Sequence, residues 1–365
     1  MSTGRDTLVV ALGGNAIQQP AQKGTFEEQL VAVDGACRRL ARLIGRGHRV
    51  IVTHGNGPQI GNLIAQNEAS AGLIPAMPMD VCGAETQGQI GLMIQQCLAN
   101  HLERNGWSDG VCTVLTETEV DGDDPAFAAP SKPVGRFYTA EQAAELALEC
   151  GYVMREDAGR GWRRVVPSPE PRRLVQADVI GRLVRNGVTV VCAGGGGVPV
   201  VRDASGAYHG VEAVVDKDLA AAVLAVDVGA DTLVILTDVD HVYLRYGQAG
   251  QQALRMVDRP ELARHVADGH FSAGSMGPKV EAALRFAQAG GSVVIARLDD
   301  VEAALRGEAG TRVVPDPEPA ADRGPVRRLT SVDAVAEARA VHTWPARQWQ
   351  PAPRIATAAS CARGG

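Results

Sequence analysis

The chain has 365 residues, of which 45% are hydrophobic and 21% charged, and its formal net charge is −6. That length is sufficient for one large α/β domain or two ordinary ones. The charge argues against a nucleic-acid-binding protein, which usually has a basic face, and the longest apolar stretch, 188–201, is too short and too interrupted by glycine and proline to span a bilayer. The N-terminus also lacks a secretory signal pattern. We therefore predict a cytoplasmic protein.

Short β-branched runs ending in Gly-rich or Asp-containing turns alternate with helical patterns along most of the chain. The predicted strands are 8–12, 50–53, 188–192, 232–236 and 293–296. The predicted helices are 26–46, 80–105, 140–149, 172–185, 217–228, 278–289 and 301–306. This alternation predicts a three-layer αβα sandwich whose open central sheet is mainly parallel. Ligands of such sheets bind beyond the carboxyl ends of the strands.

Two segments depart from the alternation. Residues 121–170 are far longer than an ordinary connection, so we predict a small protruding subdomain there, and Lys132 lies in it. Residues 316–365 are rich in Pro, Ala and Arg without a core pattern, which predicts a disordered tail. Trp344 and Trp349 leave a small docking element as the alternative for this tail.

Cysteine and histidine patterns give no metal motif. The seven cysteines are widely scattered and form no CxxC pair, which suits small buried residues in a reducing compartment. The eight histidines show no HExxH spacing. We therefore expect no metal site built by the protein.

Lysine is rare in this chain. Of the 36 basic residues, only Lys23, Lys132, Lys217 and Lys279 are lysines, and the last three stand in motifs framed by Gly, Pro or Asp. A retained lysine can indicate a site that needs a compact ammonium group rather than a planar guanidinium. For any single lysine, chance retention is an equally good explanation.

Glycine-rich turns follow three of the predicted strands, at 13–15, 54–58 and 194–197. Such turns can direct backbone N–H groups at an anion, although one alone can simply be a sharp bend. No GxxxxGK[ST] motif is present, and the nearest match to GxGxxG has its third glycine one position late. Phosphate or carboxylate binding is therefore favoured over a P-loop or a dinucleotide fold.

The lysine motifs point to phosphoryl transfer. Lys217 lies between Asp216 and Asp218 at a predicted helix start, and Lys279 lies in the first turn of another helix. Acidic residues at a helix start can merely complement its dipole. A lysine there opposes the dipole, which suggests an external anion, and phosphoryl transfer needs positioning and charge neutralisation more than a strong base.

Nine segments between about residues 7 and 315 together resemble the carbamate kinase family, a branch of the amino-acid-kinase fold. They are GGNAI (13–17), HGNGPQIGNL (54–63), DVCGAETQGQIG (80–91), PSKPVGRFY (130–138), GRGWRRVVPSPEP (159–171), AGGGGVPV (193–200), VEAVVDKDLAA (211–221), LTDVDHVY (236–243) and SAGSMGPKVEAA (272–283). The sequence departs from that pattern at Glu85, Ser131 and Arg136.

The resemblance implies reversible, Mg²⁺-dependent phosphoryl transfer between ATP and carbamate, giving ADP and carbamoyl phosphate. It also implies use in arginine breakdown and a homodimer formed through the region 80–105. The implied catalytic domain is 6–315, with a carbamate half at 6–187 and a nucleotide half at 188–315.

Site roles also follow from the resemblance. Lys217 and Lys279 would neutralise phosphate charge, Asp218 would hold both lysines, and Lys132 would reach carbamoyl phosphate. The implied substrate-binding residues are Gly13, Gly14, Asn15, Gly55, Asn56 and Gly57. The implied nucleotide-binding residues are Asp216, Asp238, Tyr243, Met276 and Lys279.

Two alternatives stay open at this level. One is another acyl-phosphate-forming kinase of the same fold, against which the segment 121–170 argues. The other is a nucleotide-binding relative without turnover, against which Lys132, Lys217, Asp218 and Lys279 argue.

Overall fold

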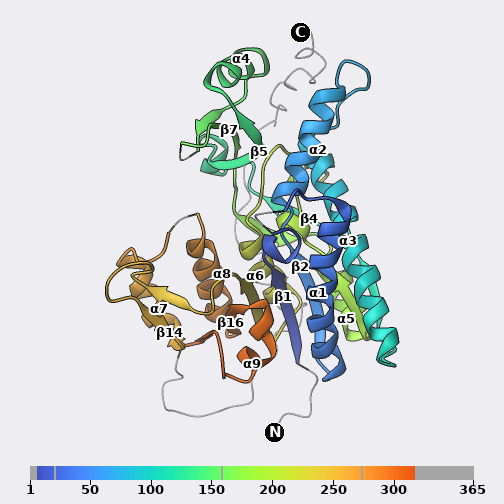
Figure 1. Cartoon of the computed structure of the whole chain (residues 1–365), viewed down its shortest axis with the longest axis vertical. Coiled ribbons are helices and arrows are strands. Elements are labelled where there is room, and N and C mark those ends of the chain that lie inside the picture. Colours follow the sequence, from blue (N-terminus) through green and yellow to red (C-terminus); the bar gives the residue numbers. More distant parts are fainter. Residues whose placement is uncertain (1–5, 20–21, 158, 273, 317–365) are drawn as a thin grey trace.

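A mainly parallel sheet forms the centre of the molecule (Figure 1). The structure, a computed structural model, describes residues 6–19, 22–157, 159–272 and 274–316. Beyond residue 316, the predicted tail lies outside the described residues. The spatial order of the central strands is β15 (Met256–Asp258), β17 (Thr311–Val314), β16 (Ser292–Arg297), β12 (Thr232–Thr237), β1 (Thr7–Leu12), β2 (Arg49–His54), β9 (Val188–Val191) and β3 (Gly110–Thr113).

The register places β1 in the middle of this sheet. Val10 lies opposite Val52 of β2 and Val234 of β12, and both pairings are parallel. Among the described strands of the sheet, only the pair β16 and β17 is antiparallel. The carboxyl ends of β1, β2, β9 and β12 therefore meet at one edge, as the predicted alternation requires.

Helices cover both faces of the sheet and make three layers. Side chains of β1 alternate between them: Val9 and Ala11 enter one core, and Leu8, Val10 and Leu12 enter the other. The helices packed in the first core are α5 (Ala177–Arg185), α6 (Lys217–Asp227), α7 (Arg259–Ala267) and α8 (Met276–Gln288). Those in the second are α1 (Phe26–Gly45), α3 (Met79–Arg104) and α9 (Val301–Leu305).

Local sequence explains why α1 forms where it does. Thr25 accepts a hydrogen bond from the Glu28 amide, and the Glu28 carboxylate accepts one from the Thr25 amide, which is a capping box. Within the helix, Val33, Cys37 and Leu40 recur at intervals of three to four residues and are fully buried. The cap sets the start of the helix, and the apolar stripe holds it against the sheet.

Smaller elements surround the main sheet. A second sheet has the order β11 (Tyr208–Gly210), β10 (Val198–Arg202), β4 (Glu117–Val120) and β8 (Pro171–Leu174). A third combines β5 (Lys132–Tyr138), β7 (Trp162–Val166) and β6 (Met154–Glu156) with α4 (Ala140–Cys150), and it projects from the main body at the top of Figure 1. The remaining elements are α2 (Gly57–Ser70), the hairpin β13 (Val242–Leu244) with β14 (Gln252–Leu254), and the 3₁₀ turns at Gly14–Ala16, Pro125–Phe127, Gly194–Gly196 and Leu298–Asp300.

One predicted helix is wrong at its start. We predict a helix over 172–185, whereas Pro171–Leu174 is the strand β8 and the helix α5 begins at Ala177. In β8, Leu174 lies opposite Thr118 of β4 and is buried, while Arg173 lies opposite Glu119 and donates to its carboxylate at 2.8 Å. Pairing with a distant strand therefore overrides the local helical pattern.

The other predicted helices and strands lie within two residues of the observed bounds. The helices α2 and α7 are absent from the prediction, although Asp258 caps α7 and Pro260 follows in its first turn. Within the described part of the chain, no helix combines the length and apolar character needed to cross a membrane.

Packing of α1 against the sheet generates a stability prediction. Leu40 is fully buried there, whereas Leu148 on α4 is 88% exposed. Leu40→Ala should lower the free energy of unfolding by about 2–5 kcal/mol, because it leaves a cavity in a packed core. Leu148→Ala should stay within about 0.5 kcal/mol of the parent. Urea unfolding of both variants measures this, and equal effects would contradict the assigned core.

Candidate active site

A buried carboxylate joins two lysines at the carboxyl edge of the sheet. Asp218 lies in the first turn of α6 and is 3% exposed. Its Oδ1 accepts a hydrogen bond from Lys217 Nζ at 2.6 Å, and its Oδ2 accepts one from Lys279 Nζ at 2.9 Å. Lys279 comes from α8 and lies 61 residues after Asp218, so the carboxylate connects two helices.

The lysines keep Asp218 ionised. Burial acts to raise the pKa of this carboxyl, but the positive charges of Lys217 and Lys279 and their hydrogen bonds outweigh it and lower the pKa to about 2. The carboxylate is therefore charged at neutral pH. It fixes the direction of both ammonium groups while leaving the cluster with a surplus positive charge.

A third lysine reaches the same helix start from the protruding sheet. Lys132 Nζ, at the beginning of β5, donates to Asp216 Oδ2 at 2.9 Å. The other oxygen of Asp216 caps α6 by accepting from the amides of Asp218 and Leu219 at 2.9 and 3.4 Å. Three ammonium groups thus meet two carboxylates here, and the excess of positive charge suits an anionic ligand.

Two glycine turns lie directly beside Lys217. A Cβ placed on Gly55 would come within 3.5 Å of the Gly14 backbone and 3.6 Å of Lys217 Cδ. The turns after β1 and β2 therefore touch each other and the lysine side chain. Backbone N–H groups of such turns, with the positive end of a following helix, can bind the oxygens of an anion.

The third glycine turn, Gly194–Gly196, closes the site from another side. Gly195 has φ +66°, and a Cβ there would lie 2.3 Å from Asn56 Nδ2. Only glycine fits this approach. Asn56 in turn donates from Nδ2 to Thr86 Oγ1 of α3 at 2.8 Å, which orients its amide.

The predicted nucleotide residues lie on four elements, and Asp216 and Lys279 have been described above. Asp238, after β12, accepts from the Asn15 side chain, so the structure links it to the glycine turn after β1. Tyr243, on β13, instead donates to Asp240 Oδ1 at 2.9 Å. Met276 is the first residue of α8, one turn before Lys279. The structure thus brings Asp216, Asp238 and Lys279 into the bonded network of the site, while Tyr243 and Met276 lie on elements that flank it.

Sequence reasoning gave His54 no role, yet its side chain supports the site. It ends β2, is 1% exposed, and its Nδ1 lies 3.0 Å from the Gly55 carbonyl oxygen. A Cβ on Gly194 would lie 2.4 Å from its ring, so the imidazole packs between two glycine turns. Its position as the first residue of HGNGP was the available signal. Burial lowers its pKa to about 4, and Lys217 acts in the same direction, so the ring is neutral.

Thr86 and Arg297 were also missed. Thr86 holds Asn56, and Arg297 Nε donates to the Asp238 carbonyl oxygen at 3.0 Å.

Of the three departures from the family pattern, Glu85 and Ser131 are exposed, and the exposed Arg136 stacks over Tyr138 at 4.8 Å. None of the three is buried among the bonded residues of the site.

Comparison with known proteins identifies the family. The sequence profile of the amino acid kinase family matches residues 6–297. The carbamate kinase of Pyrococcus horikoshii is 51% identical over 313 residues, which cover 85% of this chain and 99% of the relative. The carbamate kinase of Pyrococcus furiosus is 52% identical over 311 residues, with 84% and 99% covered.

Solved structures give the same result. The carbamate kinase from Giardia lamblia bound to AMP-PNP is 44% identical and superposes with a TM-score of 0.82, covering 86% of this chain and all of the other. The same enzyme bound to citric acid superposes with a TM-score of 0.80.

Burial of neutral His54 predicts how stability depends on pH. The unfolded chain binds a proton at this residue below about pH 6.5, whereas the folded chain resists protonation until about pH 4. Stability should therefore fall as the pH decreases across that window, by about 1.4 kcal/mol per pH unit from this group. Urea unfolding of the parent and His54→Gln across this range should give curves that converge toward low pH. Parallel curves would refute the assignment.

Proposed function

The chain belongs to the amino acid kinase family, and from that premise we propose that it acts as a carbamate kinase. It would transfer a phosphoryl group reversibly between ATP and carbamate, with ADP and carbamoyl phosphate as the other pair of reactants. The chain is a phosphotransferase whose acceptor is of the carboxyl type.

One observation carries this proposal: Asp218 holds the ammonium groups of Lys217 and Lys279 together, and the Lys217 side chain lies where the turns of Gly14 and Gly55 meet. In phosphoryl transfer, charge spreads over the oxygens of the transferring group, and catalysis depends on positioning and neutralisation. Carbamate is already an oxyanion, so the reaction needs no general base. That requirement agrees with a site whose buried histidine is neutral and held by packing.

We assign roles on this basis. Lys217 and Lys279 neutralise the transferring phosphoryl group, and Asp218 positions both of them. The Lys132 side chain, which is 38% exposed and donates to Asp216, moves onto carbamoyl phosphate when that anion binds. Backbone N–H groups of Gly13, Gly14, Asn15, Gly55, Asn56 and Gly57 bind the substrate oxygens.

The nucleotide binds over the C-terminal half, 188–315, and the carbamate side is formed by 6–187, with the protruding subdomain at 121–170. Asp216, Asp238, Tyr243, Met276 and Lys279 are the residues assigned to nucleotide binding. Tyr243 and Met276 are half-buried beside the bonded network, which suits contact with the base rather than with phosphate.

Mg²⁺ enters the proposal as part of the nucleotide substrate. Both oxygens of Asp218 and both of Asp216 already accept hydrogen bonds within the protein. Mg²⁺ is commonly held by substrate phosphates and water with few protein ligands. The arrangement of the chain's own carboxylates fits a metal that arrives on ATP or ADP.

The proposed assembly is a homodimer whose subunits meet through the α3 region. The protein would act in the cytoplasm and synthesise ATP during arginine catabolism. Val81 and Leu92 lie three turns apart on one face of α3 and are 36% and 60% exposed. These two exposed apolar side chains support an interface there. Sedimentation velocity of the full chain tests it, since a monomer would contradict the proposal.

Coupled formation of ATP from ADP and carbamoyl phosphate, with Mg²⁺ present, tests the activity. We expect turnover with carbamoyl phosphate. Turnover only with another acyl phosphate would favour a different kinase of this fold, and nucleotide binding without turnover would favour a non-catalytic relative.

The lysines provide a matched set of variants. Lys217→Arg and Lys279→Arg should each lower kcat by about 100-fold or more, because a planar guanidinium cannot reproduce both the contact to Asp218 and the contact to phosphate. Lys23 is exposed, so Lys23→Arg should keep parental activity. Initial rates in the coupled assay measure all three. Near-parental rates for the first two would remove the argument for ammonium geometry.

A further inference from the structure

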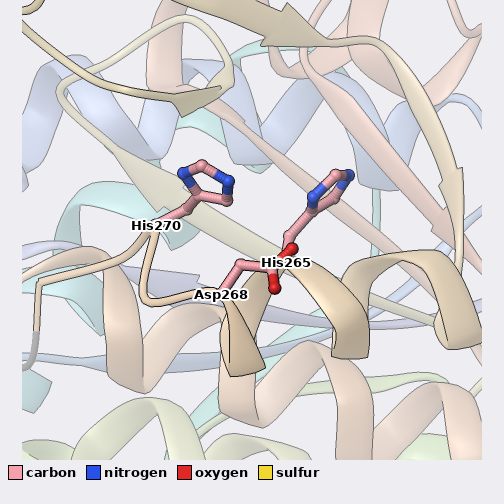
Figure 2. Close-up of side chains that lie close together, drawn as sticks. All are labelled: His265, Asp268 and His270. Carbon is pink, nitrogen blue, oxygen red and sulfur yellow. The ribbon is translucent and has the colours of Figure 1, made fainter.

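Three potential metal ligands converge at the end of α7, on residues that the proposed reaction does not use. His265, Asp268 and His270 each offer a nitrogen or carboxylate oxygen, and these atoms lie within 4.8 Å of one another. Figure 2 shows the two imidazole rings side by side, with the Asp268 carboxylate close beneath His265.

The backbone fixes this arrangement. The amide of Gly269, at φ +74°, donates to the Val266 carbonyl at 2.9 Å, and the amide of His270 donates to the His265 carbonyl at 3.2 Å. This pair of bonds is a Schellman motif, which normally places two apolar side chains in contact at these two positions. Here both positions hold histidine, and the ring centroids are 5.7 Å apart with an interplanar angle of 67°.

His265 presents a buried nitrogen that the protein does not satisfy. Within the described parts of the chain, its Nε2 is buried and has no hydrogen-bond partner. The nearest carboxylate oxygen, Glu261 Oε1, is 3.7 Å away, beyond hydrogen-bond distance. A buried polar atom without a hydrogen-bond partner destabilises the fold. A ligand bound to His265 Nε2 would remove this destabilisation.

We propose that His265, Asp268 and His270 bind a divalent transition metal, with Zn²⁺ as the ion that fits best. Two imidazoles and one carboxylate are a common zinc ligand set, and water can complete a tetrahedral site. Mg²⁺ and Ca²⁺ prefer oxygen ligands and do not suit two imidazoles. This site is separate from the lysine cluster and goes beyond the kinase activity.

The geometry requires only a small adjustment. Tetrahedral Zn²⁺, with ligand bonds of about 2.0–2.1 Å, places its ligand atoms about 3.3 Å apart. The present separations of at most 4.8 Å must therefore shorten by about 1.5 Å or less. Asp268 is exposed and both histidines are only partly buried, so side-chain rotation about a fixed backbone is sufficient.

Such an ion would join the last turn of α7 to the segment that leads into α8. His270 is six residues before Met276, the first residue of that helix. Our expectation that the chain builds no metal site rested on the lack of HExxH spacing. The sequence HVADGH places its ligands at i, i+3 and i+5 across a helix end instead, which only the Schellman turn brings together.

Metal titration of the full, tag-free chain tests the proposal. We expect isothermal titration to show that the parent binds Zn²⁺. Asp268→Asn and His270→Phe should each lower the Zn²⁺ affinity at least tenfold, because losing a direct ligand should weaken binding no less than losing a residue that only orients a ligand. Asp268→Asn is conservative at an exposed position, and His270→Phe keeps an aromatic ring against His265. Co²⁺ in place of Zn²⁺ should give tetrahedral visible absorption bands in the parent that both variants lose.

His209→Gln is the matched control, because His209 pairs with the Asp203 carboxylate at 2.7 Å and has no place in the three-residue cluster. It should bind Zn²⁺ as the parent does. Unchanged binding in Asp268→Asn and His270→Phe, or no binding by the parent, would overturn the proposal and leave the two rings as an aromatic contact at a helix end. Unfolding temperatures measured without metal separate a binding defect from a folding defect.

Discussion

The carboxylate of Asp218 is the group on which the arrangement of the site depends. A charge that is 3% exposed is tolerated only when it is paired, and here each oxygen accepts from one lysine. Because those lysines come from α6 and α8, both helices must be in place before the carboxylate is satisfied. The pairing therefore connects the folding of the C-terminal layer to the geometry of the ammonium groups.

Asp216 extends the same constraint to the protruding sheet. One of its oxygens caps α6, which holds Asp218 in the first helical turn, and the other receives Lys132 from β5. Asp216 thus caps the helix and also holds Lys132, which lies 84 residues earlier in the chain. An anion that competes for Lys132 would loosen this contact without disturbing the cap, because the two oxygens act separately.

The glycine turns can lie against Lys217 and against each other because glycine has no side chain to occupy the space between them. Gly55 approaches Gly14 and Lys217 within about van der Waals contact, and Gly195 leaves room for the Asn56 amide. Neutral His54 fills the remaining space beside Gly194. Backbone donors, ammonium groups and an uncharged packing residue suit a reaction between an oxyanion and a nucleotide, because the three lysines outnumber the two aspartates with which they pair.

The amino-acid sequence by itself determined the alternation of strands and helices, the starts of the capped helices α1, α4 and α6, and the chemistry-bearing lysines, because these depend on neighbouring residues and on recurring motifs. It did not determine that Pro171–Leu174 is a strand or that His54 is buried beside Lys217, since both follow from partners far away in the chain. Nor did spacing reveal that His265, Asp268 and His270 converge, because a single left-handed glycine reverses the chain there. The tertiary structure decided which side chains meet, since distances between charges depend on packing and not on separation along the sequence.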